Sequence, residues 1–388
     1  MLHRLPNIFT RSLFLPFALL FVIGSLMSCS DSSTKKNDQA NEKSDLPQTA
    51  IKAGKYIILD TRTDQGDRAT AKKNAENTLK KYPSLDAMVG LWAYNVPQCL
   101  EALKDVGKEG KVKLISFDED ELTLQGIKDG HIVGTVVQQP YEFGYQSVKY
   151  LKALVENQTV DIPDNKQLDI PTKVIKQENV EDFWSNLKSL QKLGQQANNS
   201  PRPTEGHYFA FVVNLPDPFW SYARAGCYKA EQDFNLVCDF KIPHDGSSTE
   251  QNRILETLIQ KEGLAGIAVS PLDPKNQTEI LNKVAEKVKL ICHDSDAPES
   301  NRLFYLGTNN YLGGRQVGKL IKEALPEGGQ IMIFVGKMDV LNAQQRRQGG
   351  RRPRRLCLSA PGLHVQCGWW LPRHHVRPPE RNNAAGGW

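Results

Sequence analysis

The feature that most constrains the fold is an alternation of short apolar segments with longer amphipathic ones. One such set runs from about residue 55 to 155, and a second begins at His207 and runs to Val335. Short apolar runs that end in turn residues are typical of strands buried on both faces, and the segments between them have helical spacing. The alternation predicts an α/β protein with parallel sheets that carry helices on both faces.

The expected elements follow this rhythm closely. Strands are expected at 56–59, 87–91, 113–117, 132–137, 209–213, 234–242, 266–269, 288–292, 303–306 and 330–335. Helices are expected at 69–82, around 99–103, and at 122–129, 141–155, 181–193, 223–234, 249–262, 277–286, 311–323 and 339–348. Gly130 is expected at the C′ position of the helix that precedes it, because glycine tolerates the left-handed conformation there.

The stretch from His207 to Phe234 joins an expected strand to an expected helix through a polar and aromatic loop. Ligands of open parallel sheets lie beyond the carboxyl ends of the strands, so Asp217, Phe219 and Trp220 are candidate binding residues. Adjacent aromatic rings fit the flat C–H face of a sugar ring. The same pair also fits a structure in which one ring packs beneath the sheet.

Polar side chains follow the other expected strands as well. They are Arg62, Asp64, Trp92, Asn95, Asp118 and Gln138 in the first set, and Asn214, Ser270, His293, Asp294, Thr308 and Asn309 in the second. Carboxylates and amides pair with vicinal hydroxyls, although each residue alone also fits a cap or turn. Together they indicate a polyol site, and the sequence contains no phosphate-binding glycine loop.

The first residues have the layout of an export signal. Residues 1–28 combine a basic start, an apolar core and small residues, and Leu26-Met27-Ser28-Cys29 resembles the lipobox of bacterial lipoproteins. Cys29 is therefore the expected lipidation site, and the polar residues 29–50 are an expected tether. A cleaved signal that leaves an unanchored periplasmic protein is the alternative.

The formal net charge of +5 comes largely from arginines after residue 345. Residues 349–388 have no periodic apolar pattern, and lysine does not occur after Lys337, so this tail is expected to be disordered. An out-of-frame extension and an arginine-rich nucleic-acid arm are both compatible with its composition. The rest of the chain is close to neutral, which argues against a nucleic-acid partner.

The remaining cysteines show no metal-binding spacing. They are Cys99, Cys227, Cys238, Cys292, Cys357 and Cys367. The first four lie in apolar stretches and are expected to be buried thiols, with a Cys227–Cys238 disulfide as an alternative. No cofactor is expected. A metal at His293, Asp294 and Asp296 has weak support, because no further histidine lies nearby.

An acidic run at residues 118–121 raises the possibility of an enzyme. A glycosidase needs two carboxylates that flank one bond, and Asp118, Glu119, Asp120 and Glu121 supply carboxylates. The run also fits the start of a helix, where negative charge is favoured.

Several motifs together resemble one family. They include VVNLPDPFW, GIAVSPLDPKNQ, HDSDAP, YLGTNNYLGGRQVGKL, VGLWAYN, ISFDED and LQGIKDGHIVGTVVQQPYEFGYQSV. These resemble the periplasmic sugar-binding proteins of ABC transporters of the ribose-binding type, over about residues 52–180 and 206–349. The resemblance implies the type I periplasmic-binding-protein fold, with two doubly wound parallel-sheet lobes that close on a monosaccharide in a cleft.

The resemblance also implies a set of ligand contacts. One lobe would provide Asp217, Phe219, Trp220, Ser270 and Asp294, and the other would provide Asn95, Asp118, Gln138 and Arg346. Many members have Asp-Arg where this chain has Asp294-Ser295, which removes one guanidinium and leaves the sugar unspecified. The implied partners are a monosaccharide, an ABC permease or membrane sensor, and the membrane through the lipid anchor, and a monomer is expected.

The two family halves occur here in exchanged order, which resembles a circular permutation. Each lobe is then expected to combine segments from both parts of the chain. The first lobe would contain residues 51–137 and 311–348, and the second would contain residues 138–180 and 206–310. Residues 181–205 would form the linker between the two parts of the chain. A sugar receptor is the first functional hypothesis. A rearranged fusion product with little binding, a glycosidase and a transcription regulator are the others, and no helix-turn-helix precedes the first sheet to support the last.

Overall fold

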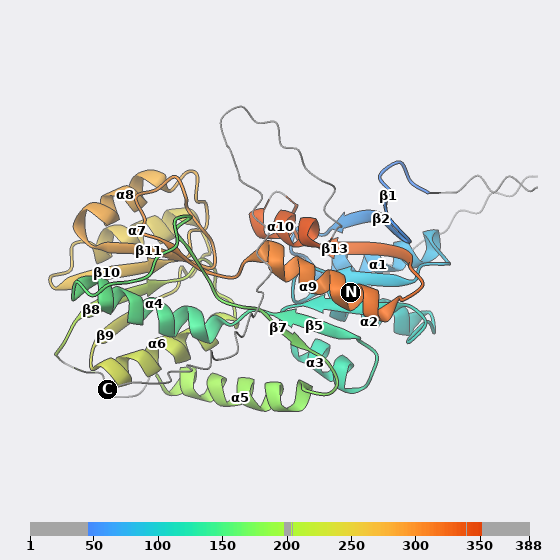
Figure 1. Cartoon of the computed structure of the whole chain (residues 1–388), viewed down its shortest axis with the longest axis horizontal. Helices are drawn as coiled ribbons and strands as arrows, with labels where there is room; N and C mark the ends of the chain where they lie inside the picture. The colour runs from blue at the N-terminus through green and yellow to red at the C-terminus, as the bar shows by residue number, and fades with distance from the viewer. Residues whose placement is uncertain (1–45, 198–202, 204, 339, 351–388) are drawn as a thin grey trace, which may run out of the picture. The chain divides into compact units, whose positions relative to one another are not determined.

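The computed structural model describes residues 46–197, 203, 205–338 and 340–350. The expected lipidation site at Cys29, the signal, most of the tether and the tail from residue 351 lie outside these residues. Two sheets organise the described part of the chain (Figure 1). No helix in this part is both long enough and apolar enough to cross a bilayer.

The first sheet has seven strands in the order β1-β2-β13-β3-β4-β5-β7. Their bounds are β1 (Ile51–Ala53), β2 (Tyr56–Thr63), β3 (Ala87–Gly90), β4 (Lys113–Phe117), β5 (Gly134–Val137), β7 (Lys173–Ile175) and β13 (Gly329–Val335). The five inner strands are parallel, as expected, but β1 and β7 pair antiparallel at the two edges. The sheet is therefore mixed, because an edge strand can be added from either direction.

Helices cover both faces of this sheet. On one face lie α1 (Arg68–Lys81), α2 (Asn95–Asp105) and α3 (Glu121–Lys128), and on the other lie α9 (Asn310–Ala324) and α10 (Leu341–Gly349). Strand β3 shows how the pleat divides the core, since Met88 packs with the first group and Val89 with the second. The two cores are thus built from alternate residues of the same strands.

The second sheet has six parallel strands in the order β6-β12-β11-β10-β8-β9. Their bounds are β6 (Gln167–Asp169), β8 (Tyr208–Val212), β9 (Val237–Lys241), β10 (Leu264–Val269), β11 (Lys289–His293) and β12 (Tyr305–Gly307). Helices α4 (Pro140–Val155) and α6 (Trp220–Phe234) cover one face, and α7 (Ser248–Leu258) and α8 (Thr278–Lys287) cover the other. The prediction of an α/β protein with doubly wound sheets is confirmed.

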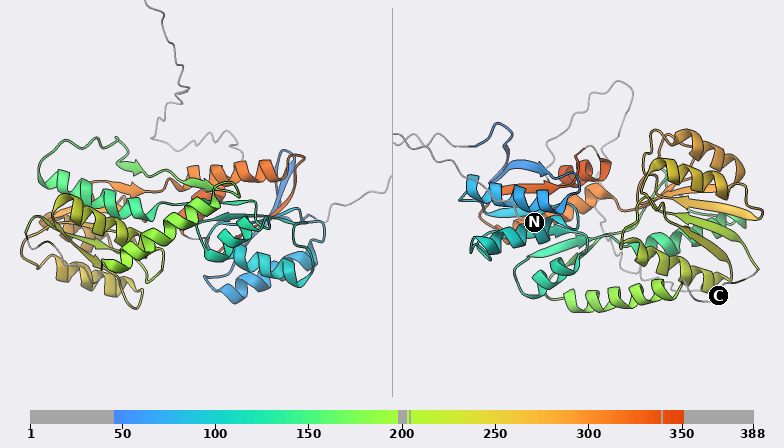
Figure 2. Two further views of the ribbon diagram at one scale, coloured as in Figure 1. Left: turned by 90° about the horizontal axis from the view of Figure 1, so that it is seen from below. Right: turned by 180° about the vertical axis from the view of Figure 1, so that it is seen from behind.

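Each sheet takes strands from both parts of the chain. Strand β13 lies between β2 and β3, and β6 pairs with β12, although more than a hundred residues separate the partners. The orange strand β13 is visible among the blue and cyan strands of the first sheet (Figure 1, Figure 2). Strand β7 lies in the first sheet, whereas the expected bounds assigned residues 138–180 to the second. The domain bounds and the circular permutation remain predictions.

Some boundaries differ from those expected. The segment 234–242 is not one strand, because α6 continues to Phe234, Asn235 adopts a left-handed conformation, and β9 begins only at Val237. Within the expected linker lies α5 (Val180–Gln196), which packs on α6 so closely that a Cβ on Gly194 would lie 2.3 Å from the Ser221 carbonyl oxygen. Gly130 has a φ of 78° after α3, which confirms its expected C′ role.

The four cysteines in the described residues are buried thiols, as expected, and none forms a disulfide. Cys227 and Cys238 lie within hydrogen-bond reach of each other, and burial raises the pKa of Cys227 well above its usual value. The alternative of a Cys227–Cys238 disulfide is therefore not observed.

Candidate functional site

The carboxylate of Asp294 lies at the carboxyl end of β11 and is held by two neighbours. Its Oδ2 accepts hydrogen bonds from Ser270 Oγ at 3.0 Å and from Asn214 Nδ2 at 3.3 Å. Asn214 Nδ2 also lies 3.1 Å from Ser270 Oγ. Burial raises the pKa of Asp294 to about 6, although the Ser270 hydrogen bond acts in the opposite direction. The three side chains follow three neighbouring strands, so they meet at one edge of the second sheet.

A second polar group surrounds Asp118, at the carboxyl end of β4 in the first sheet. Asp118 Oδ1 accepts from Gln138 Nε2 at 3.0 Å, and Asp118 Oδ2 lies 3.3 Å from Arg346 Nη1. Arg346 is almost completely buried, and it also donates to the Asn310 side chain at 2.8 Å and to the Leu91 carbonyl at 2.9 Å. Burial raises the pKa of Asp118 even though Arg346 stabilises its charged form.

The two groups are close enough to interact electrostatically. The positive charge of Arg346 lowers the pKa of Asp294, while the negative charge of Asp118 raises it. Asp217, an exposed residue of the loop after β8, raises the pKa of Asp118. Carboxylates from both sheets therefore share one region with the buried guanidinium of Arg346.

A cavity of about 570 Å³ adjoins this region. Its polar lining includes Asp169, Asp294, Thr308, Asn310 and Asn342. Thr308 Oγ1 and Asn342 Oδ1 are buried and have no hydrogen-bond partner among the described residues. A buried polar atom without a partner costs free energy.

The two aromatic residues expected to contact a ligand, Phe219 and Trp220, differ in how deeply they are buried. Trp220 is 3% exposed and packs edge-to-face against Phe211 and His293 in the core of the second sheet. Phe219 is partly buried and lies edge-to-face against Trp220, with ring centroids 5.0 Å apart. Asp217 is exposed and accepts from the Phe219 backbone at 2.8 Å. The ligand roles of all three remain predictions, and Trp220 occupies the position foreseen for a ring packed beneath the sheet.

Asn95 belongs to a separate network. Its amide nitrogen donates to Asp64 Oδ2 at 3.0 Å, and its amide oxygen accepts from the Trp92 backbone at 3.0 Å. Tyr94 also donates a hydrogen bond to Asp64. The side chain is completely buried, so its polar atoms already have protein partners. Its role as a ligand contact remains a prediction.

The residues of the acidic run at 118–121 have different structural roles. Asp120 is the N-cap of α3 and accepts from the Leu122 backbone at 2.9 Å, and Glu121 lies in the first helical turn. Both carboxylate oxygens of Glu119 are buried without a partner among the described residues, and burial raises the pKa of Glu119 to about 8. The helix-start interpretation therefore accounts for the end of the run.

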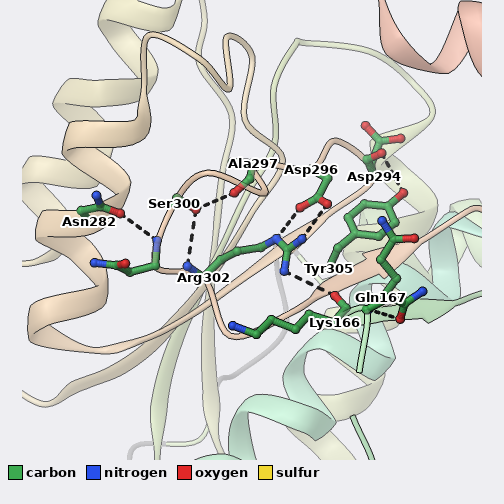
Figure 3. A network of polar contacts seen from close by, with 11 residues as sticks. Lys166, Gln167, Asn282, Asp294, Asp296, Ala297, Ser300, Arg302 and Tyr305 are labelled. Atoms are coloured by element: carbon green, nitrogen blue, oxygen red, sulfur yellow. Dashed lines mark hydrogen bonds and ion pairs between the residues drawn. The ribbon is translucent and has the colours of Figure 1, made fainter. Parts of the chain in front are cut away.

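The proposed metal ligands are each held by other groups. Burial lowers the pKa of His293 to about 3, and its ring stacks on Phe211. Asp296 forms an ion pair with Arg302, whose Nη2 lies 2.7 Å from Asp296 Oδ2 (Figure 3). Within the described residues no group of three or more potential ligands is placed to hold a metal ion.

The same network fixes the loop that carries Asp294. Arg302 Nη1 lies 3.3 Å from the Lys166 carbonyl, and the Tyr305 hydroxyl donates to the Asp294 carbonyl at 3.0 Å (Figure 3). Asp294 has a φ of 57°, an uncommon conformation that aspartate tolerates better than most residues. The network thus holds a strained residue in place at the cavity wall.

The sequence analysis missed several polar residues at this cavity, among them Asp169, Asn310 and Asn342. Asn310 follows Thr308 and Asn309, which were recognised as a strand end, so its position beside β12 was available as a signal. Asn342 lies on α10, and no local pattern links it to a cavity beside the second sheet. Its placement depends on how distant segments pack.

Comparison with known proteins gives a family model that matches most of the chain. A family model described as a periplasmic binding protein domain matches residues 29–159 and 209–365. The ribose import binding protein RbsB of Salmonella typhimurium is 26% identical over 123 residues, which are 31% of this chain and 40% of that protein. RbsB of Salmonella typhi gives the same values. The chain therefore spans less than half the length of these curated relatives.

Two solved structures show more limited similarity. A solute-binding protein from Burkholderia graminis in complex with D-arabinose is 25% identical, with 39% of this chain and 52% of that chain covered and a TM-score of 0.36. The arabinose-binding protein AraP from Geobacillus stearothermophilus is 26% identical, with 38% and 50% covered and a TM-score of 0.35. TM-scores this low do not by themselves establish a common fold.

Proposed function

The chain belongs to the periplasmic binding protein domain family, and from this premise we propose that it binds a monosaccharide or a similar small polyol. The family is one of solute-binding proteins, which are not enzymes, so it does not support the glycosidase hypothesis. The observation that carries the proposal is the partly buried Asp294 carboxylate, fixed by Ser270 and Asn214 at the wall of a polar cavity.

The chemistry of the cavity suits a ring with several hydroxyls. A carboxylate accepts hydrogen bonds from hydroxyls, while a threonine hydroxyl can both donate and accept. Asp294 and Asp169 supply acceptors, and Thr308 and Asn342 supply polar atoms that lack protein partners. The cavity size lies within the range of small-molecule sites, which is about 300–1,000 Å³.

The second polar group completes the proposed contacts. Asn310 lines the cavity and accepts a hydrogen bond from Arg346, which in turn contacts Asp118. A polyol bound to Asn310 would therefore contact a side chain that is linked through Arg346 to Asp118 at the end of the first sheet. Gln138 would act by holding Asp118 in position.

The proposed cellular role follows from the family and from the names of the relatives. The name of RbsB refers to ribose import, so we propose a pentose or a related aldose as the ligand. The protein would deliver this ligand to an ABC permease or a membrane sensor. A lipid at Cys29 would anchor a monomeric protein on the outer side of the membrane. A rearranged chain with little binding remains the competing proposal.

The first prediction concerns the ligand itself. Calorimetric titration of the full chain with ribose, arabinose, allose, glucose and galactose is expected to give saturable heat for at least one sugar. Asp294→Asn removes a charged acceptor and is expected to weaken that sugar by roughly ten- to a hundredfold, the range for hydrogen bonds to charged groups.

An exposed carboxylate supplies the control. Asp164→Asn makes the same chemical change on a turn outside the cavity and is expected to leave the affinity unchanged. A folded protein that gives no heat with any of the five sugars would support the rearranged-chain alternative. Equal weakening by both variants would remove Asp294 from the site.

A further inference from the structure

We propose that a second cavity, on the α9 face of the seven-stranded sheet, binds a long-chain fatty acid. This cavity has a volume of about 840 Å³ and shares no lining residue with the polar cavity beside Asp294. It lies between the sheet, α9 and α10, and it is linked to the proposed polyol site through Arg346, which lines this cavity and also contacts Asn310 and Asp118.

The floor and one wall of the cavity are apolar. Ile58, Val89, Ile331 and Ile333 come from neighbouring strands, and Val317 and Ile321 come from α9. The four strand residues are only 1–6% exposed. A slender flexible chain can contact this small exposed surface of the strands. A helix is a poorer fit, because it needs a space about 10 Å wide. Burial of methylene groups provides about 0.8 kcal/mol each, so an alkyl chain gains free energy along the floor.

The rim of the cavity is basic. Lys55, Arg315, Lys319, Lys322 and Arg347 line it, and no acidic residue does so among the described residues. Arg315, Lys319 and Lys322 are exposed on one side of α9, at the i, i+4 and i+7 positions. Long cationic side chains place their charges in water above an apolar surface. A monoanionic head group at the rim and an alkyl chain on the floor would match both features.

The remaining chain after Gly350 is a poor match for the same cavity. Gly349 and Gly350 line one end of it, so the following segment begins there. That segment starts Arg351-Arg352-Pro353-Arg354-Arg355, and its positive charges would meet a rim of the same sign. Charge complementarity therefore favours an anion from outside the chain.

The test is displacement of a fluorescent anion by dodecanoate. The full chain is expected to enhance the emission of anilinonaphthalene sulfonate, and dodecanoate below its micelle concentration is expected to reverse the enhancement with saturation. The double variant Lys319→Glu, Lys322→Glu places two negative charges at the rim and is expected to weaken dodecanoate by about tenfold or more.

A matched double variant separates this site from general charge effects. Lys73→Glu with Lys80→Glu reverses two exposed lysines on α1, which covers the opposite face of the same sheet, and is expected to leave dodecanoate binding unchanged. Urea unfolding of each variant confirms that the fold is retained. Failure of dodecanoate to displace the probe, or equal weakening in both double variants, would overturn the proposal.

Discussion

At the scale of single residues, two aspartates occupy equivalent positions in the two sheets. Asp118 directly follows β4 and Asp294 directly follows β11, and their φ angles are 63° and 57°. Both side chains are partly buried, and desolvation raises both pKa values. A left-handed aspartate after a strand turns the chain sharply and directs its carboxylate beyond the sheet edge, where ligands of parallel sheets bind.

Glu119 gives a prediction of pH-dependent stability. Its pKa is raised from 4.5 to about 8 by burial, and further by the negative charges of Asp118 and Asp217. A raised carboxyl pKa means that the folded state holds the proton more tightly, so stability is lost as pH rises from about 4.5 to 8. Glu119→Gln cannot ionise. It is expected to gain stability over the natural chain between pH 6 and pH 8, on the order of 1–3 kcal/mol.

Urea unfolding of both proteins at pH 6 and pH 8 measures this gain. Glu121→Gln is the control, because Glu121 is exposed in the first turn of α3. Stability differences that stay constant between the two pH values would contradict the assigned burial of Glu119.

Residue types at strand ends were predictable, but their directions were not. The sequence places Asp118, Gln138, Ser270 and Asp294 after strands, and the structure brings these side chains into two hydrogen-bonded groups. The sequence could not show that Trp220 points into the core, because the first turn of a helix can present either of two adjacent rings to the sheet. Tertiary packing decides such directions.

At the scale of elements, helices α4 and α6 contact each other backbone to backbone. A Cβ on Gly226 would lie 2.0 Å from the Tyr141 carbonyl oxygen, and one on Gly144 would lie 2.0 Å from the Ala223 carbonyl oxygen. Both glycines are buried, and neither contact leaves room for a methyl group. The two helices can therefore lie this close only where both lack a side chain.

Gly226→Ala is expected to destabilise the protein by about 2 kcal/mol or more, because the added methyl group meets backbone atoms that cannot rotate away. Gly318→Ala, also within a helix, is the comparison. There the nearest atom is the Gly350 carbonyl oxygen at 3.3 Å, and the helix propensity of alanine offsets the crowding. Thermal unfolding of both variants gives the contrast. Similar losses at the two positions would contradict the packing of α4 on α6.

Long elements were predictable from periodicity, whereas three of the four strands with only three residues were not. The ten or more residues of α4, α6 and α9 repeat the helical pattern several times. Strands β1, β6 and β7 have three residues each, which is too short for an alternating pattern to be recognised. They are strands because a neighbouring edge accepts their hydrogen bonds.

At the scale of the whole molecule, neither sheet can be completed by one half of the chain. The first sheet requires β13 as an inner strand between β2 and β3, and the second requires β6 at its edge. Alternation of segments predicts two sheets, but pairing between residues as distant as Tyr56 and Gly329 is not encoded in any local pattern. The sequence order alone leaves the position of β13 open.

A cut between the two parts tests this arrangement. A protease site inserted before Glu205, an exposed residue, is expected to yield two fragments that elute together in gel filtration after cleavage, because β13 stays paired with β2 and β3. Urea above the unfolding midpoint is expected to separate them. Separation in native buffer would contradict the shared sheets.

The place of β13 also has a consequence during synthesis. The ribosome releases β2 and β3 more than two hundred residues before β13, so each presents an unpaired inner edge until the last strand arrives. Unpaired edges invite pairing with other chains. The risk of aggregation for such a nascent chain is therefore greatest before Gly329 to Val335 have been synthesised.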